Sequence, residues 1–487
     1  MTRIILFILI ITGSVMAQDF ELADYLNTKY ESYKETTLNI RRFKHSDIVP
    51  LIERLKNNNL YKVNKAGTSA QGRDIYLISF GNGPTKVFLW SQMHGDEPSA
   101  TMALFDIFNF LNSGDQKEFK DDLLKKLTIY VMPMVNPDGA EVFERRNSAN
   151  IDINRDAVRQ QTPEGRLLRS TFEGIKAKFG FNLHDQSPRY SVGNSHKAAA
   201  LSFLAPTTSY EKGIDDVREG AIKLIGVMYR TLSNFIPGYI AKYSDEFEPR
   251  AFGDNFQKWG TSTILIESGG WKNDPEKQQI RKMNFIGILT ALQSIASESY
   301  KNEPNSTYDS IPFNDKFIMD LLLKNLTYEC GTTTQTIDIG INRDEVNKEG
   351  SKDFYYKSKI EDIGDLSVFY GYEETDLTGY EAVPGKVYEK EFSSVDELKK
   401  VNFNSLYEQG YTFVKVNSSE IIDAFIDLPI NIITDKTFNA NSRIVIEDNP
   451  NFVIKKDGIV KYAVINGFLH DLSNPDKNNG NGLKFPQ

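Results

Sequence analysis

Short apolar segments alternate with longer amphipathic segments along the first three hundred residues of the chain. Apolar runs of strand length between helical patterns are typical of a central sheet that helices cover on both faces. We therefore expect an α/β fold with a mixed, mostly parallel central sheet. The predicted strands are 75–80, 86–90, 127–133, 179–184, 201–206 and 262–267, and the predicted helices are 98–112, 116–126, 164–178, 211–233 and 274–297.

The pattern changes on either side of this region and predicts further domains. Residues 18–62 read as an N-terminal helical segment of two helices, and residues 63–303 as the main domain. A polar segment near residue 303 is followed by alternating stretches such as "SRIVIED", which predict a C-terminal β-rich domain over 304–472. Residues 473–487 are rich in Asn, Gly and Pro, so we expect a disordered tail.

The first residues, "MTRIILFILIITGSVMAQDF", have the pattern of a secretory signal peptide over 1–17. Arg3 precedes an apolar run, and small residues precede a cleavage site after Ala17. The run is shorter than a membrane span requires, which disfavours the alternative of an uncleaved anchor. We expect an exported, periplasmic or secreted protein with no membrane span after signal cleavage.

Charge and cysteine content exclude several kinds of partner and site. The formal net charge is −9 and no basic patch stands out, so nucleic acid is not an expected partner. Cys330 is the only cysteine, which excludes an internal disulfide and a metal site built from cysteines. Metal chemistry would have to use histidines and carboxylates. The oligomeric state is left open.

Chemically active side chains follow three of the predicted strands. His94 and Glu97 come after strand 86–90, His184 ends strand 179–184, and Glu267 ends strand 262–267. In open α/β sheets, ligands bind beyond the carboxyl ends of the strands. Two imidazoles and a carboxylate are the usual ligands of a catalytic zinc that keeps one position open. We predict that His94, Glu97 and His184 bind one Zn²⁺ per chain.

The remaining candidates complete a hydrolytic site. Zinc activates water as a nucleophile, and Glu267 is the candidate general base that takes the proton from this water. A ligating histidine normally donates its other N–H to a carboxylate, which Asp152 can supply to His94. Either Arg145 or Arg146 suits stabilisation of an oxyanion.

The pair Asn154 and Arg155 suits a different task. A guanidinium beside an amide can grip a carboxylate in two places. We therefore predict a peptide substrate with a free C-terminal carboxylate.

The ordered motifs "HGDE", "NPDG", "RRNSANIDINRD", "NLHDQ" and "ILIES" closely resemble those of zinc metallocarboxypeptidases related to carboxypeptidase A. The resemblance covers residues 67–297 and implies a carboxypeptidase-like fold for the main domain. It implies zinc ligation by the residues already named and favours Arg145 for polarising the scissile carbonyl. It also implies the roles given above for Asn154, Arg155, Glu267 and Asp152. The family's mobile tyrosine precedes its glutamate by some twenty residues, and the matching segment contains only Tyr243.

The predicted function is that of an exported metallocarboxypeptidase that hydrolyses the C-terminal peptide bond. A cell-wall peptide amidase or an N-acyl amino acid deacylase could use the same zinc site, because their substrates also carry a carboxylate. A catalytically inactive peptide-binding module is the second alternative. The residue that would be removed and the role of the β-rich domain are left open.

Overall fold

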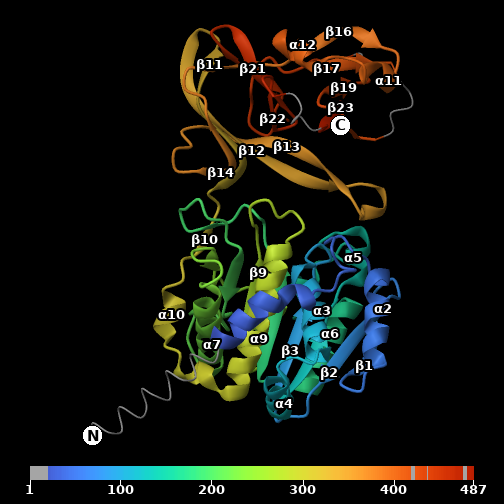
Figure 1. The fold of residues 1–487 in the computed structure, drawn as a ribbon, viewed down its shortest axis with the longest axis vertical. Coiled ribbons are helices and arrows are strands. Elements are labelled where there is room, and N and C mark those ends of the chain that lie inside the picture. Colours follow the sequence, from blue (N-terminus) through green and yellow to red (C-terminus); the bar gives the residue numbers. More distant parts are fainter. Residues whose placement is uncertain (1–19, 418–422, 436, 475–479, 487) are drawn as a thin grey trace. The chain divides into compact units, whose positions relative to one another are not determined.

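The computed structural model describes residues 20–417, 423–435, 437–474 and 480–486. The chain divides into two compact units, with the boundary between Lys316 and Phe317 (Figure 1). The predicted signal peptide lies outside the described residues. Within the described ranges, no helix combines the length and the apolar character needed to cross a membrane.

The first unit is built on an eight-stranded mixed sheet in the order β1-β2-β4-β3-β5-β9-β7-β8. The four neighbours β4, β3, β5 and β9 run parallel, whereas β1, β2 and β4 pair antiparallel, as do β7 and β9. The predicted mixed, mostly parallel sheet is confirmed. The strands are β1 (Lys62–Thr68), β2 (Asp74–Phe80), β3 (Thr85–Ser91), β4 (Leu127–Met132), β5 (Phe179–Asp185), β7 (Leu201–Leu204), β8 (Ile240–Lys242) and β9 (Ser262–Ser268).

Helices cover both faces of this sheet because its strands are apolar on both sides. Val87 and Leu89 of β3 face one hydrophobic cluster, while Phe88 and Trp90 face the other. The first cluster contains side chains of α2 (His45–Lys56), α3 (Ser99–Asn112), α4 (Lys117–Lys126), α7 (Asp216–Leu232) and α9 (Gln278–Ser297). The second contains side chains of α6 (Pro163–Ile175) and α8 (Phe252–Lys258).

The six predicted strands and five predicted helices all exist, with ends that differ by a few residues. The motif "NPDG" supplies the N-cap and the first residues of the short helix α5 (Pro137–Val142). Asn136 caps this helix, because its Oδ1 accepts a hydrogen bond from Gly139 N at 2.9 Å, and proline suits the first turn. A Cβ on Gly95 would collide with the backbone of Gly139, so the "HGDE" loop packs closely against the "NPDG" loop only because residue 95 is glycine.

The N-terminal segment is part of the first unit and is held by a buried ion pair. Residues 20–29 are helical and precede a 3-10 turn, η1 (Tyr30–Ser32), and α2. Arg281 of α9 is fully buried and donates to both carboxylate oxygens of Asp106 in α3, at 2.5 and 2.7 Å. Nη1 donates to the backbone carbonyl of Leu38, and Nη2, which also binds Asp106, donates to that of Glu35. One guanidinium therefore links two core helices to the segment that precedes α2.

Residues 304–316, which the sequence pattern grouped with the β-rich region, contribute two short elements to the first unit. These are α10 (Asn305–Asp309) and β10 (Asn314–Asp315). Strand β10 pairs antiparallel with β6 (Ser191–Val192). A further 3-10 turn, η3 (Ser299–Asn302), follows α9.

The second unit contains an eight-stranded sheet and a five-stranded sheet. The first has the order β13-β12-β11-β15-β20-β21-β22 with β14 also paired to β11, and the second has the order β16-β17-β19-β23-β18. Its strands are β11 (Ile318–Cys330), β12 (Thr333–Asn347), β13 (Phe354–Gly364), β14 (Tyr370–Asp376), β15 (Glu381–Pro384), β16 (Lys386–Phe392), β17 (Tyr411–Val416), β18 (Phe425–Ile426), β19 (Asn431–Ile433), β20 (Phe452–Lys456), β21 (Ile459–Ile465), β22 (Phe468–Asp471) and β23 (Gly482–Phe485).

The second unit is β-rich, as the alternating pattern predicted, with only short helices among its described residues: η4 (Glu349–Ser351), α11 (Val395–Leu398) and α12 (Phe403–Glu408). Part of the expected disordered tail is ordered. Residues 482–485 form β23, in which Leu483 is fully buried and its N–H donates to Asn431 Oδ1 at 2.9 Å. This buried apolar side chain explains why a tail rich in Asn and Gly pairs with a sheet.

The substitution R281M tests the buried ion pair. It leaves the Asp106 carboxylate buried without its cation, which should lower the free energy of unfolding by about 3–5 kcal/mol. Urea denaturation followed by tryptophan fluorescence measures this change. K117A, at an exposed lysine, serves as the control and should leave the midpoint unchanged. An R281M midpoint equal to that of the wild type would contradict the structural role of the pair.

Candidate metal centre and active site

Three neighbouring parallel strands place the predicted site residues at one edge of the sheet. Strand β3 pairs with β5 up to Ser91 and Leu183, and β5 pairs with β9 so that His184 lies beside Glu267. The turn after β3 then carries His94 and Glu97. The side chains come from distant parts of the sequence and meet because all three strands end on the same side.

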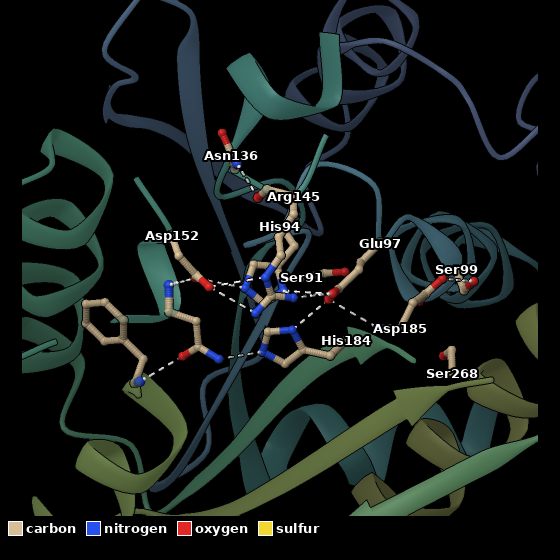
Figure 2. A network of polar contacts seen from close by, with 12 residues as sticks. Ser91, His94, Glu97, Ser99, Asn136, Arg145, Asp152, His184, Asp185 and Ser268 are labelled. Carbon is tan, nitrogen blue, oxygen red and sulfur yellow. Dashed lines mark hydrogen bonds and ion pairs between the residues drawn. The ribbon is translucent and has the colours of Figure 1, made fainter. Parts of the chain in front are cut away.

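His94, Glu97 and His184 form a buried cluster whose donor atoms lie within 4.8 Å of one another. The carboxylate of Glu97 lies between the two imidazoles: Oε1 is 2.7 Å from His94 Nδ1, and Oε2 is 2.7 Å from His184 Nδ1 (Figure 2). All three residues are less than a tenth exposed. In the part of the chain that the structure describes, this is the one group of such side chains close enough to hold a metal ion.

The electrostatics of the cluster favour a cation. Burial opposes ionisation of Glu97, yet the neighbouring histidines lower its pKa well below the usual value. Burial also opposes charge on His94, but Glu97 and Asp152 together raise its pKa to about 9. Burial lowers the pKa of His184, which favours its neutral, ligating form. The raised pKa of His94 shows that the cluster attracts positive charge. Its two imidazoles and one carboxylate are also the usual ligands of a catalytic zinc.

Asp152 and Arg145 form a second layer of contacts around His94. Asp152 Oδ1 is 3.1 Å from His94 Nε2, and its Oδ2 accepts a hydrogen bond from Arg145 Nε at 3.1 Å. Arg145 Nη1 lies 3.0 Å from His94 Nδ1 and donates to Glu97 Oε1 at 3.3 Å. Figure 2 shows these side chains turned toward one another.

The structure separates Arg145, which the family resemblance favours, from its neighbour Arg146. Arg145 is beside the cluster, whereas Arg146 is exposed and donates to the backbone carbonyl of Asn150 at 3.1 Å. Burial opposes the positive charge of Arg145, but Glu97 and Asp152 raise its pKa. Arg145 is therefore the guanidinium available for chemistry at the cluster.

Asn154 and Arg155 lie on the 3-10 turn η2 (Ile153–Arg155), where Asp152 Oδ1 accepts from Asn154 N at 2.9 Å. The side chain of Asn154 is held on both sides: Nδ2 is 3.5 Å from His184 Nε2, and Oδ1 accepts from Phe252 N at 2.9 Å. The turn thus places the Asn154 amide next to His184 and puts Arg155 one residue further along.

Arg155 already has an acidic partner that the sequence did not indicate. Its Nε lies 3.2 Å from Glu248 Oε2, and Glu248 also binds Arg250 through both carboxylate oxygens at 3.0 Å. Arg155 Nη1 donates to Asn154 O at 2.9 Å. Among the described residues, Nη2 of Arg155 has no hydrogen-bond partner, so this edge of the guanidinium can meet a ligand.

Glu267 ends β9 next to the cluster. Burial raises its pKa well above the usual value, and the negative charges of Glu97 and Asp185 add to the effect. Its carboxylate has no hydrogen bond or ion pair with another residue that the structure describes. A carboxylate with a raised pKa and free oxygens is suited to accept and return a proton.

Tyr243 follows β8 and also lies near the site. Its ring centroid is 6.4 Å from that of Tyr190, and burial followed by the charge of Glu267 raises its pKa. This places its hydroxyl within the electrostatic field of Glu267. Tyr243 is the one tyrosine in the segment that matches the position of the family's mobile tyrosine, and it follows β8, which pairs with β7 beside β9.

Residues 48–222 match the family model described as zinc carboxypeptidase, Peptidase_M14. The matched range contains every candidate named above except Glu267 and Tyr243. The resemblance of the sequence motifs to this family is confirmed by this match.

Curated relatives are similar over parts of their length. Carboxypeptidase 2 of Trichophyton tonsurans is 26% identical over 138 residues, which cover 28% of this chain and 25% of that protein. Carboxypeptidase SOL1 of Arabidopsis thaliana is 28% identical over 146 residues, which cover 26% of this chain and 29% of that protein. The chain spans about a quarter of the length of the curated relatives it matches.

Solved structures of metallocarboxypeptidases are also similar. A metallo-carboxypeptidase from Burkholderia cenocepacia has a TM-score of 0.41 at 15% identity, covering 52% of this chain and 68% of its own. Thrombin activatable fibrinolysis inhibitor has a TM-score of 0.45 at 14% identity, covering 58% of this chain and 80% of its own.

Removal of Asp152 tests the contact with His94. D152A frees His94 Nε2 and Arg145 from their shared anchor, so zinc affinity should fall about 10- to 100-fold. Competition with a fluorescent zinc chelator measures the affinity directly. R146A in the same loop is the matched control and should leave the affinity unchanged. Equal affinity in D152A and the wild type would show that Asp152 does not support the metal site.

Proposed function

We propose that the chain is an exported zinc-dependent carboxypeptidase that hydrolyses the C-terminal peptide bond of peptides. The match of residues 48–222 to the zinc carboxypeptidase family supports this proposal. The observation that carries it is the buried cluster of His94, Glu97 and His184 with Glu267 on the neighbouring strand. This arrangement combines a metal-binding donor set with a free carboxylate of raised pKa.

His94, Glu97 and His184 would hold one zinc ion. When bound, zinc polarises a carbonyl oxygen and lowers the pKa of water. Asp152 fixes the orientation of the His94 ring through Nε2, so one ligand is preorganised before the metal binds. The mostly buried walls of the cluster exclude bulk water, which strengthens every charge interaction inside.

Glu267 is the proposed general base. Its carboxylate accepts a proton from the attacking water and returns this proton to the nitrogen of the leaving amine. Burial and the charges of Glu97 and Asp185 raise its pKa, which strengthens this carboxylate as a proton acceptor. The absence of a competing hydrogen bond from the described residues leaves both oxygens available.

Arg145 is the proposed electrostatic stabiliser of the oxyanion. Its Nη1 lies beside His94 and Glu97, and Asp152 holds the guanidinium through Nε and Nη2. Because the side chain is anchored in advance, little reorganisation is needed as negative charge develops on the carbonyl oxygen.

Asn154 and Arg155 are proposed to bind the terminal carboxylate of the substrate. The Asn154 amide contacts His184 of the cluster, and the Arg155 guanidinium donates to the backbone carbonyl of Asn154. Glu248 shares the guanidinium from the other side, so a substrate carboxylate would bind to Nη2 beside an existing ion pair. This arrangement favours substrates with a free C-terminus over their amides.

The substitution E267Q tests the general base. Glutamine keeps the shape of the side chain but cannot accept the proton, so hydrolysis of a blocked dipeptide should fall at least about 1000-fold. Zinc content, measured by elemental analysis, should stay at one ion per chain. Full activity of E267Q would remove Glu267 from the proposed role. A wild-type protein that binds zinc but hydrolyses no peptide would leave only a binding module.

A pair of matched substrates tests the terminal-carboxylate site. The rate constant kcat/KM should be about 100-fold lower for a blocked dipeptide amide than for the free acid, because the amide carries no charge for Arg155. R155M should lower kcat/KM for the acid strongly and for the amide only slightly. Equal cleavage of both substrates by the wild type would instead favour an amidase or a deacylase with a different specificity.

A further inference from the structure

Lys277 is a buried lysine that contacts Ser268, the residue after the proposed base Glu267. It lies between β9 and α9, in the polar sequence "GGWKNDPEKQQI", at the start of the helix predicted over 274–297. The structure buries its side chain, which is 11% exposed. Its ammonium donates to Ser268 O and to Asp185 Oδ2, each at 3.0 Å.

These two acceptors sit at the ends of the two strands that carry the chemistry. Asp185 follows His184 at the end of β5, and Ser268 follows Glu267 at the end of β9. In the parallel pairing, Asp185 lies opposite Ser268 and His184 opposite Glu267. The Lys277 ammonium therefore joins the last residue pair of this ladder, one position beyond the histidine and the glutamate.

The local conformation of Lys277 is unfavourable by itself. Its φ is +52°, a left-handed conformation that is uncommon for residues other than glycine. It is also the N-cap residue of α9, where a positive charge opposes the helix dipole. A residue keeps such a strained backbone conformation only when contacts with the rest of the fold hold it there. The contacts with Asp185 and Ser268 are the ones available to do so.

Asp185 depends on this lysine for charge compensation. Its carboxylate is 6% exposed, and Oδ2 accepts hydrogen bonds from Lys277 and from Ser99 Oγ, the latter at 2.6 Å. Oδ1 is buried and has no hydrogen-bond partner among the described residues. The backbone N–H of Asp185 donates to Glu97 Oε2 at 3.2 Å. Displacement of Asp185 would therefore disturb the cluster as well as β9.

We infer that Lys277 is a positioning residue, whose ammonium fixes the end of β9 against β5 and so holds the Glu267 carboxylate in register with the His184 imidazole. Lys277 does not contact the reacting atoms. This inference rests on the proposed hydrolase function, because it concerns the placement of that function's base. A carboxylate that shifts by about 1 Å from its reacting partner can lose about 100-fold in rate.

The test uses K277M, which has a side chain of similar length without the ammonium. With the zinc-loaded enzyme and a blocked dipeptide, kcat should fall about 100-fold. KM should change little, because Arg155 and Asn154 are untouched. Zinc content should remain one ion per chain, and the melting temperature is measured in parallel. K272M, at an exposed lysine of the same loop, is the matched control and should behave as the wild type.

Two further variants separate positioning from stability. K277R keeps a cation that can reach both acceptors and should recover most of kcat. The double variant K277M/D185N removes both charges of the buried pair, so its melting temperature should return toward that of the wild type. Its kcat should stay low, because the ammonium link between the two strand ends is missing and only the backbone bond from Gln186 N to Ser268 O remains.

Recovery of full kcat in K277M/D185N would overturn the inference, because Lys277 would then serve only to neutralise Asp185. Unchanged kcat in K277M, measured below its melting temperature, would overturn it as well. Both outcomes differ from failure of the proposed function, in which the wild type and K272M would themselves hydrolyse no peptide.

Discussion

The parallel pairing of β3, β5 and β9 is the constraint on which the site depends. Hydrogen bonds of the two ladders fix Ser91 beside Leu183 and His184 beside Glu267. Because side chains alternate between the faces of a strand, a shift by one residue would turn His184 or Glu267 away from its present direction. The apolar core on both faces of the sheet holds this register, since each strand buries alternate side chains in a different cluster.

The second requirement is the compensation of buried charge. Glu97, Asp152, Asp185 and Glu267 bring four carboxylates into a small volume, and unpaired charges there would be costly. The two histidines and Arg145 neutralise Glu97 and Asp152, while Lys277 neutralises Asp185. Glu267 lacks a direct partner among the described residues, and burial together with the charges of Glu97 and Asp185 raises its pKa. The same electrostatic balance favours a cation at the cluster.

Much of this could be predicted from sequence, because the strands are short apolar runs whose ends carry His, Glu or Asp. The edge location of His94, Glu97, His184 and Glu267 followed from that pattern alone. Contacts that depend on the direction of individual side chains could not be predicted from this pattern. The residues themselves left Arg145 and Arg146 as alternatives, and only the family resemblance favoured Arg145 before the structure showed that Arg146 is exposed. The Glu248–Arg155 pair joins residues from separate loops. Lys277 lies in a polar stretch at the start of the predicted helix 274–297, and its burial depends on tertiary contacts with Asp185 and Ser268.

X-ray absorption spectroscopy at the zinc edge of the purified, metal-loaded protein is the most direct test of the central claim. The account predicts nitrogen and oxygen neighbours at about 2.0–2.2 Å, with the outer scattering of two imidazoles. In H184A the outer scattering should correspond to one imidazole. A zinc ion with sulfur neighbours, or a spectrum unchanged by H184A, would contradict a metal centre built from His94, Glu97 and His184.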